Sequence, residues 1–138
     1  MREHSPLKLI ARSGADISVL SALLQDALLA GVDMQYIAAE KTLICLLNRY
    51  CRETEKEAPQ RRLCGLKIGQ VEKVQTLQIA LEKEQFYNLL SIEYEEAEKL
   101  LILTFSGGAA IRLFIEEITI TLGDVAEAHP SLARPVHE

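Results

Sequence analysis

Tryptophan is absent from this chain of 138 residues, and aromatic residues make up only 5% of it. Proteins that bind single-stranded nucleic acid need exposed aromatic faces on which the bases stack. The formal net charge is −5, whereas nonspecific binding to a phosphate backbone depends on an excess of Lys and Arg. The short basic stretch from Arg61 to Lys73 has no interleaved aromatic residues. The composition therefore disfavours a nucleic-acid partner.

Long apolar runs are also missing. No run approaches the roughly 20 residues that span a bilayer, and Lys8 interrupts an N-terminal apolar stretch that is too short for a signal sequence. The three cysteines, Cys45, Cys51 and Cys64, form no CxxC motif, and one of them stays unpaired under any intramolecular pairing. We therefore expect reduced thiols, no membrane contact and a cytoplasmic location.

Residues that could hold a metal or act as a catalytic base are poorly placed. The histidines lie near the ends of the sequence, without a Cys or carboxylate at a ligand spacing: His4, His129 and His137. A zinc site and a Ser-His-Asp triad are therefore not expected. Arg61 and Arg62 could lower the pKa of the neighbouring Cys64 thiol, but a structural thiol is the favoured interpretation for all three cysteines.

Acidic residues cluster at Glu93–Glu98 and Glu116–Glu117. This spacing fits the solvated face of a strand better than an acid–base pair, which would need a cleft around it. We therefore predict no catalytic residue, no metal and no cofactor, and the chain is not expected to be an enzyme.

The first regular elements are a short strand at Leu7–Ala11 and a helix. Ser13 and Asp16 have the spacing of a helix N-terminal cap. The apolar residues that follow recur every three or four positions and mark one helix face: Ile17, Leu20, Leu24, Ala27 and Leu28. Gly31 is the expected C-terminal stop.

Period-two alternation takes over after the helix and predicts β-strands. The charged segment Arg52–Arg62 is expected to be a solvated loop, and residues 124–138 a flexible tail. No internal repeat and no linker are recognised, so residues 1–138 form one expected domain with an ordered core of about 6–123. The expected strands are Asp33–Ala38, Thr42–Tyr50, Leu63–Ile79 with interruptions at Gly65 and Gly69, Asn88–Glu95, Lys99–Ser106 and Ala109–Leu122.

The pair Gly107-Gly108 lies between two of these strands and does not precede a helix. This position favours a two-residue hairpin turn, with Ser106 opposite Ala109, over a phosphate-binding loop. One face of the hairpin would line the interior, and the helix could cover the other. The apolar residues change parity at Glu116-Glu117, where we expect a bulge or sharp bend that curls the sheet.

One set of polar residues interrupts the apolar pattern: Gln25, Asp26, Asn48, Arg49 and Arg112. Arg112 would lie on an apolar face of the hairpin, and an arginine in such a place needs an anionic partner. We expect Asp26 to be that partner, in a structural ion pair between helix and sheet. The alternative is a small-ligand or anion-binding site centred on Arg112, Arg49 and Gln25.

Three segments carry a resemblance to a known family: Leu20–Leu28 (LSALLQDAL), Leu46–Tyr50 (LLNRY) and Leu103–Glu116 (LTFSGGAAIRLFIE). Over nearly its whole length the chain resembles an uncharacterised family of small cytoplasmic proteins from alphaproteobacteria, a domain of unknown function. The resemblance implies a bacterial, cytoplasmic, single-domain protein, and it implies no activity.

The patterns together predict an α+β domain in which one N-terminal amphipathic helix packs on a strongly bent antiparallel sheet or barrel-like meander. A pleckstrin-homology-like barrel is the nearest familiar shape, by analogy alone. The expected function is a non-enzymatic binding or assembly module that acts through protein contacts. Its partner would be another protein, or a second copy that binds through a sheet edge or the second face of the hairpin.

Overall fold

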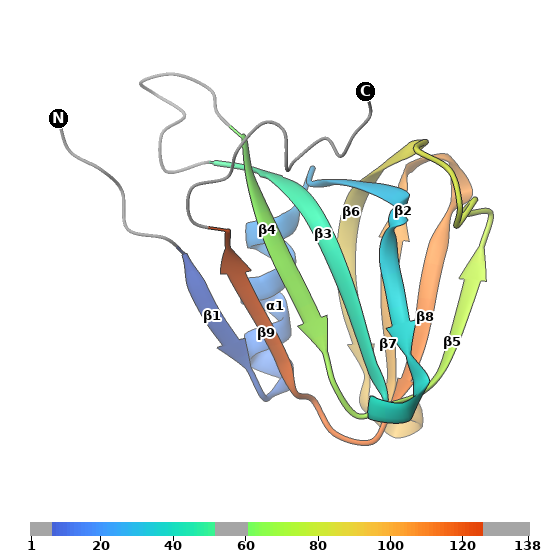
Figure 1. The fold of residues 1–138 in the computed structure, drawn as a ribbon. Coiled ribbons are helices and arrows are strands. Elements are labelled where there is room, and N and C mark those ends of the chain that lie inside the picture. The colour runs from blue at the N-terminus through green and yellow to red at the C-terminus, as the bar shows by residue number, and fades with distance from the viewer. Residues whose placement is uncertain (1–6, 52–60, 126–138) are drawn as a thin grey trace, which may run out of the picture.

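In the part of the chain that the structure describes, the fold consists of one antiparallel sheet, one α-helix and short 3-10 turns (Figure 1). The computed structural model describes residues 7–51 and 61–125. Nine strands lie in the order β1-β9-β4-β3-β2-β6-β7-β8-β5, so β1 and β5 are the two edges. The sheet bends strongly and stays open. The predicted α+β class and bent antiparallel sheet are confirmed, and closure into a barrel is not reached.

The elements are short, and the 3-10 helices η1, η3 and η4 each lie in the turn of a β-hairpin. Along the chain they are β1 (Lys8–Ala11), α1 (Gly14–Leu24), β2 (Leu28–Ile37), η1 (Ala38–Glu40), β3 (Thr42–Tyr50), β4 (Arg61–Ile68), β5 (Val71–Leu77), β6 (Phe86–Glu95), η3 (Glu96–Glu98), β7 (Leu100–Phe105), η4 (Ser106–Gly108), β8 (Ala110–Ile115) and β9 (Ile120–Asp124).

Helix α1 begins where the sequence predicts and ends earlier. Ser13 Oγ accepts a hydrogen bond from Asp16 N (3.3 Å), which caps the helix, and the Asp16 carboxylate accepts one from the N–H of Arg12, the residue before the cap (2.9 Å). The prediction that the helix runs to Gly31 is wrong, because it ends at Leu24. Asp26 then takes a left-handed φ of 73° and donates its backbone N–H to Leu89 O, so a tertiary strand contact ends the helix.

Gly31 lies inside β2 and has a packing role. A Cβ atom at this position would overlap the backbone carbonyl of Ala80. The glycine therefore permits the close approach of the segment between β5 and β6 to strand β2, and it does not stop a helix.

The glycine pair forms a hairpin turn between β7 and β8, as predicted, but the predicted register is wrong by one residue. Phe105 N donates to Ala109 O (2.8 Å), so Ser106, Gly107 and Gly108 all belong to the turn. A slip of one residue changes which residues lie opposite one another across the hairpin. Ile102, in place of Leu103, therefore lies opposite Arg112.

The expected bend after the hairpin is confirmed. β8 ends at Ile115, and β9 begins at Ile120 in another part of the sheet. A matching break separates β4 from β5 at Gly69-Gln70, where the sequence also shows a parity change. Both breaks let one continuous stretch of chain supply two different regions of the sheet.

The chain contains an internal repeat that the sequence analysis does not recognise. Residues 36–44 (YIAAEKTLI) and 94–102 (YEEAEKLLI) have closely similar sequences. Each segment leaves a strand, forms a 3-10 turn and passes through a left-handed lysine, Lys41 or Lys99, with a φ of 53° in both cases. The hairpins β2–β3 and β6–β7 are therefore structurally equivalent.

The strand pairing extends this equivalence to four strands in each repeat. β3 pairs with β4 as β7 pairs with β8, and the last strand of each repeat crosses to the other, so β9 pairs with β4 and β5 with β8. At the centre β2 pairs with β6, with Leu28 opposite Asn88 and Ala30 opposite Phe86. An approximate twofold rotation thus relates β2–β5 to β6–β9.

Hydrogen bonds between the two crossing segments fix this exchange of strands. Gly69 N donates to Thr119 O, and Glu116 N donates to Gln70 O, both at 2.9 Å. Each segment donates one hydrogen bond and accepts one. The two repeats are therefore interlocked at this point.

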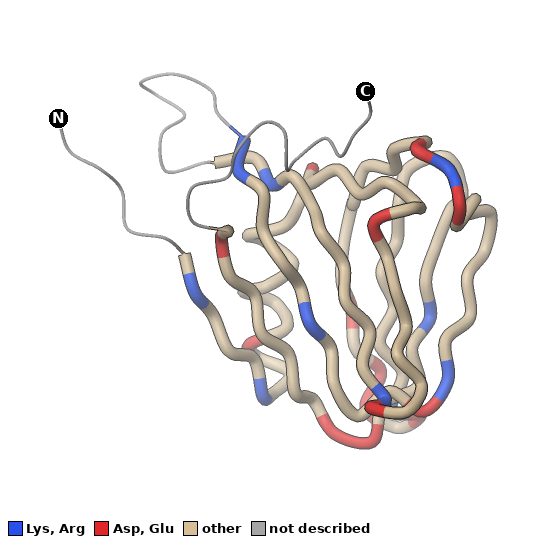
Figure 2. The backbone as a smooth tube through the Cα atoms, in the orientation of Figure 1, with Lys and Arg blue, Asp and Glu red and all other residues tan. Residues whose placement is uncertain are grey.

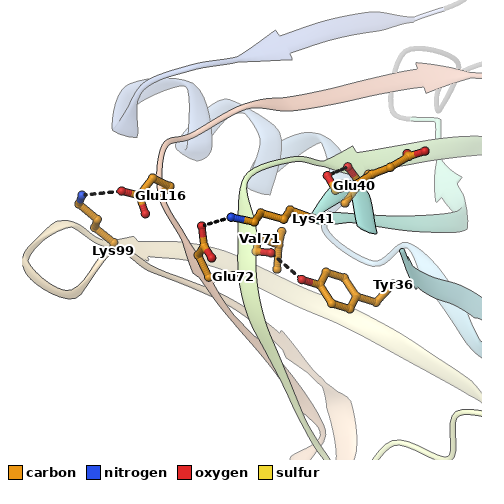
Figure 3. A network of polar contacts seen from close by, with 8 residues as sticks. Tyr36, Glu40, Lys41, Val71, Glu72, Lys99 and Glu116 are labelled. Atoms are coloured by element: carbon orange, nitrogen blue, oxygen red, sulfur yellow. Dashed lines mark hydrogen bonds and ion pairs between the residues drawn. The ribbon is translucent and has the colours of Figure 1, made fainter. Parts of the chain in front are cut away.

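Exposed ion pairs occupy matching positions beside the crossing (Figure 3). Lys41 Nζ lies 3.1 Å from Glu72 Oε2, and Lys99 Nζ lies 3.9 Å from Glu116 Oε2. Exposed pairs of this kind contribute little to stability. The matching positions of these ion pairs show that the repeat extends to side chains.

Strand β1 and helix α1 break the twofold relation. β1 pairs with the edge of β9, and α1 packs mainly against β6, where Ser21 Oγ accepts a hydrogen bond from Ile92 N (2.9 Å). Between β5 and β6 the chain forms neither strand nor helix. The expectation that the helix covers the β7–β8 hairpin is wrong, because it lies beside β6.

Two strand boundaries also differ from those predicted from the sequence. Arg61 and Arg62 belong to β4, although the sequence suggests a loop, and Asp124 belongs to β9, although the sequence suggests a tail. Residues 52–60 of that loop and 126–138 of that tail, together with His4, His129 and His137, lie outside the described residues.

Replacing Gly31 with alanine should lower the free energy of unfolding by about 1–3 kcal/mol, because the added Cβ overlaps backbone that cannot move freely. Gly65→Ala is the matched control, since no atom lies within 4 Å of its added Cβ. The control should leave stability unchanged or raise it by up to about 1 kcal/mol. Urea unfolding of both variants measures the difference, and equal effects would contradict the packing role of Gly31.

Candidate functional site

A buried ion pair between β3 and β9 is the main polar contact inside the described core. Arg49 Nε lies 2.9 Å from Asp124 Oδ1, and Arg49 Nη2 lies 3.0 Å from Asp124 Oδ2, which is a bidentate geometry. The two side chains are only 2% and 1% exposed. Strand β4 lies between them in the sheet, with Arg62 opposite Arg49 and Cys64 opposite Asp124.

The surroundings of Asp124 keep its carboxylate ionised. Burial by itself would raise the pKa of Asp124. Hydrogen bonds from Arg49 and from Leu7 N (2.9 Å), together with the charges of Arg49 and Arg62, outweigh burial and hold this pKa below its ordinary value. Asp124 thereby links β9 to β3 and to the residue that leads into β1.

The thiols next to this ion pair are poorly suited to react. Cys45, Cys51 and Cys64 are all buried, and none of the three is in a disulfide. Burial raises the pKa of Cys45 and Cys64 to about 12, and the negative charge of Asp124 adds to the effect at Cys64. The suggestion that Arg61 and Arg62 give Cys64 a lowered pKa is wrong, because burial outweighs the lowering effect of the nearby Arg49 charge. The burial of all three cysteines agrees with a structural interpretation. Within the described ranges, no group of His, Cys, Asp and Glu could hold a metal ion.

The five predicted site residues are not gathered into one site. Arg49 points into the core, where its guanidinium contacts Asp124. Asp26 and Asn48 lie close together, because Arg61 Nη1 donates to the backbone carbonyls of both, at 3.0 Å each. These contacts use backbone atoms and hold the end of α1 against the β3–β4 pair. The ligand-binding role of the set stays a prediction.

Arg112 lies elsewhere and is exposed. It belongs to β8, with Gln75 of β5 on one side and Ile102 of β7 on the other. The expected ion pair with Asp26 is wrong, because Asp26 follows α1 and contacts β6. The one-residue slip in the hairpin register also changes the neighbours of Arg112, because Ile102 lies opposite it in place of Leu103.

Shallow clefts follow the seam between α1 and β6. A cleft of about 450 Å³ lies at the N-terminal end of the helix, lined by Arg12, Tyr94, Glu96 and Glu117 among others. A second, of about 380 Å³, lies at the other end and is lined by Ser18, Ser21, Gln25 and Glu93 among others. Gln25 is the one predicted site residue that lines either of these clefts.

The solvent side of the β6–β7–β8 strands, which we call the hairpin face, has a regular charge arrangement. Across the strands Glu93 lies opposite Ile102, and Ile102 lies opposite Arg112. In Figure 2 the acidic positions of β6 and the basic positions of β8 and β5 lie on opposite sides of β7. The hairpin face consists of Ser91, Glu93, Glu95, Leu100, Ile102, Thr104, Ala110, Arg112 and Phe114, of which Leu100 is buried.

Comparison with known proteins gives a family and no activity. The model of a family described as "protein of unknown function (DUF2948)" matches residues 7–137. The chain belongs to this family. No curated protein and no solved structure matches it. The predicted resemblance to an uncharacterised family is thus confirmed, while bacterial origin and cytoplasmic location stay predictions. No helix among residues 7–51 and 61–125 is long and apolar enough to cross a membrane.

Asp124 is the residue that sequence reasoning misses. Its position after the last predicted strand suggests a tail, and 75 residues separate it from Arg49. A signal was nevertheless present in β3, where Leu43, Cys45, Leu47 and Arg49 share one parity. That pattern places Arg49 on the buried face and implies a buried acid without saying which one.

Removing one partner of the ion pair should destabilise the fold strongly. Arg49→Met should lower the free energy of unfolding by about 3–5 kcal/mol, because Asp124 would stay buried without its counter-charge. Adding Asp124→Leu should restore a large part of the loss, since both charges are then gone. Urea unfolding of the single and double variants measures this, and additive losses would contradict the coupling.

The same pair predicts a pH dependence. The pKa of Asp124 is lowered by folding, so its contribution is complete above the unfolded-state value of about 3.9 and is lost as the pH falls toward the lower folded value. Wild-type stability should therefore fall more steeply below about pH 4 than that of the Arg49→Met, Asp124→Leu double variant. Parallel curves from pH 7 to pH 2.5 would contradict this assignment.

The thiols should resist alkylation in the folded state. At pH 8 a thiol with a pKa of about 12 is almost entirely protonated, and burial blocks the reagent as well. Iodoacetamide should modify Cys45 and Cys64 at least about tenfold more slowly in native protein than in urea. Peptide mass spectrometry resolves each site, and rapid native labelling would contradict the structural role.

Proposed function

We propose that this protein is a non-enzymatic assembly module that acts through protein contacts and forms a homodimer through the hairpin face. The observation that carries the proposal is the row Glu93, Ile102 and Arg112, which places an acid and a base on either side of an apolar residue. The unreactive thiols and shallow clefts also favour contact over chemistry. Three cysteines outside any disulfide fit a reducing compartment such as a bacterial cytoplasm.

The charge arrangement selects one symmetry. When two copies stack these faces about a twofold axis parallel to β7, β7 lies over β7 and each β6 lies over the partner's β8. Glu93 of each copy then faces Arg112 of the other, and Ile102 meets its own counterpart. An axis perpendicular to the strands would instead bring β6 onto β6 and place like charges together, so charge complementarity favours the first arrangement.

The interface also has an apolar centre. Four residues of the central strands β7 and β8 are partly exposed in the monomer: Ile102, Thr104, Ala110 and Phe114. Leu77, on the neighbouring strand β5, is 54% exposed and extends the apolar area. Burial of such side chains is the main favourable term in association, while the flanking charges set the register.

The alternative, a small-ligand or anion site centred on Arg112, Arg49 and Gln25, has less support. Arg49 is buried on the inner face of β3, whereas Arg112 is exposed on β8 and Gln25 lines a cleft beside α1. An anion that bridges all three would need a different arrangement of the strands. Arg112 is instead available for contact with another protein.

Charge reversal tests the proposed dimer, because mixing two reversed variants should restore the affinity that each one loses alone. Glu93→Arg alone and Arg112→Glu alone should each raise the dimer dissociation constant about tenfold or more, because each places like charges at both symmetric contacts. Mixing the two variants should restore wild-type affinity, since every contact in the mixed dimer pairs opposite charges. Analytical ultracentrifugation and native mass spectrometry measure these states. A monomeric wild type, or no gain on mixing, would contradict the proposed dimer.

A further inference from the structure

Two strand edges that are equivalent under the twofold relation differ in whether another strand covers them. The twofold relation between the repeats makes β9 the counterpart of β5, because β9 pairs with β4 as β5 pairs with β8. β9 has a strand on both sides, β4 and β1. Among the described residues, β5 has a strand on one side only. The edge of β5 therefore lacks the covering strand that its counterpart has.

The register identifies the matching residues. Leu43 pairs with Ile68 in the first repeat, as Leu101 pairs with Leu113 in the second. Ile68 then pairs with Ile120 and Leu113 with Val74, so Ile120 of β9 corresponds to Val74 of β5. Two residues further along each strand, Leu122 corresponds to Thr76 in the same way.

Exposure shows what the covering strand does. Ile120 and Leu122 are each 1% exposed, and β1 places Ala11 and Leu9 opposite them. Val74 is only half-buried, and Thr76 is exposed, although its neighbour Ile111 on β8 is fully buried. The core side of β5 is therefore open where the core side of β9 is closed.

We propose that the edge of β5 binds an extended segment of a partner protein, which adds to the sheet as β1 adds to β9. The segment would run antiparallel to Val74–Leu77 and supply main-chain hydrogen bonds to the free edge. Its inward side chains would be apolar, like Leu9 and Ala11 of β1, and would cover Val74 and Thr76. This deepens the proposed function by naming a class of partner, and it rests on the proposal that the chain acts through protein contacts.

Charge defines the outward side of the bound segment. Lys73 is exposed on the solvent side of β5 and lies over the Phe114 ring, 5.7 Å from its centroid. The nearby Glu72 is engaged with Lys41, which leaves Lys73 without a carboxylate partner in the described part of the chain. A segment with acidic outward residues complements this edge. Pairing of β5 with β5 of a second copy would instead bring two Lys73 side chains to the same edge.

A pair of labelled peptides tests the proposal. In one fluorescein-labelled peptide, glutamate alternates with leucine, and in its matched control lysine replaces glutamate. Fluorescence anisotropy should show tighter binding of the acidic peptide to the wild-type protein, by up to about fivefold. Lys73→Glu should reverse this preference, while a circular dichroism melt confirms that the variant stays folded.

Further controls distinguish main-chain binding at β5 from dimerisation through the hairpin face. Two further versions of the acidic peptide carry N-methyl groups on alternate amides, each version along one of the two edges of the extended peptide. The version whose methylated amides face β5 should not bind, because its main-chain hydrogen bonds to the strand are removed. The Glu93→Arg variant should bind the acidic peptide as the wild type does, even where its dimer is lost. Equal binding of all N-methylated peptides, or an unchanged preference in Lys73→Glu, would overturn the proposal. Loss of the dimer alone would count against the hairpin-face contact only.

Discussion

The crossing of two backbone segments, at Gly69-Gln70 and Glu116–Thr119, is the constraint on which the rest of this structure depends. Two reciprocal hydrogen bonds join these segments, one from Gly69 N and one from Glu116 N. Because of the crossing, the last strand of each repeat completes the other repeat's half of the sheet. Neither repeat has a complete sheet of its own, and stability must therefore be shared across the whole domain.

This interlocked arrangement explains the position of the buried ion pair. Asp124 reaches Arg49 only because β9, from the second repeat, lies against β4 of the first. The carboxylate also binds the backbone of Leu7, so one side chain joins the exchanged strand to the start of β1. The ion pair therefore lies on the inner face of the sheet near its edge, where β1 pairs with β9.

Much of the fold could be predicted from sequence because local periodicity determines it. The helix cap at Ser13, strand β3 and the glycine turn are all set by residues close in the chain. The end of α1 could not be predicted in this way, because a contact between Asp26 and Leu89 decides it. The hairpin register failed for a related reason, since a turn of two residues and a turn of three both suit the same glycine pair.

The candidate site could be predicted less well than the fold. Arg49 belongs to the predicted ligand-binding set, a role that stays a prediction, and its ion-pair partner Asp124 lies in a region whose sequence resembles a tail. The predicted register gives Arg112 the wrong neighbour on β7, and the exposure of its side chain makes it a candidate contact residue. The repeat was overlooked because only the turn segments, residues 36–44 and 94–102, keep a visible sequence similarity.

The central claim is that two equivalent edges of one interlocked sheet differ because only one of them is covered. Native-state hydrogen exchange, followed by NMR for the individual amides of β5 and β9, tests it most directly. The account predicts slow exchange throughout Ile120–Asp124 and fast exchange at those amides of Val74–Leu77 that point away from β8. Equal protection of the two strands would contradict it, because it would mean that the edge of β5 is already covered.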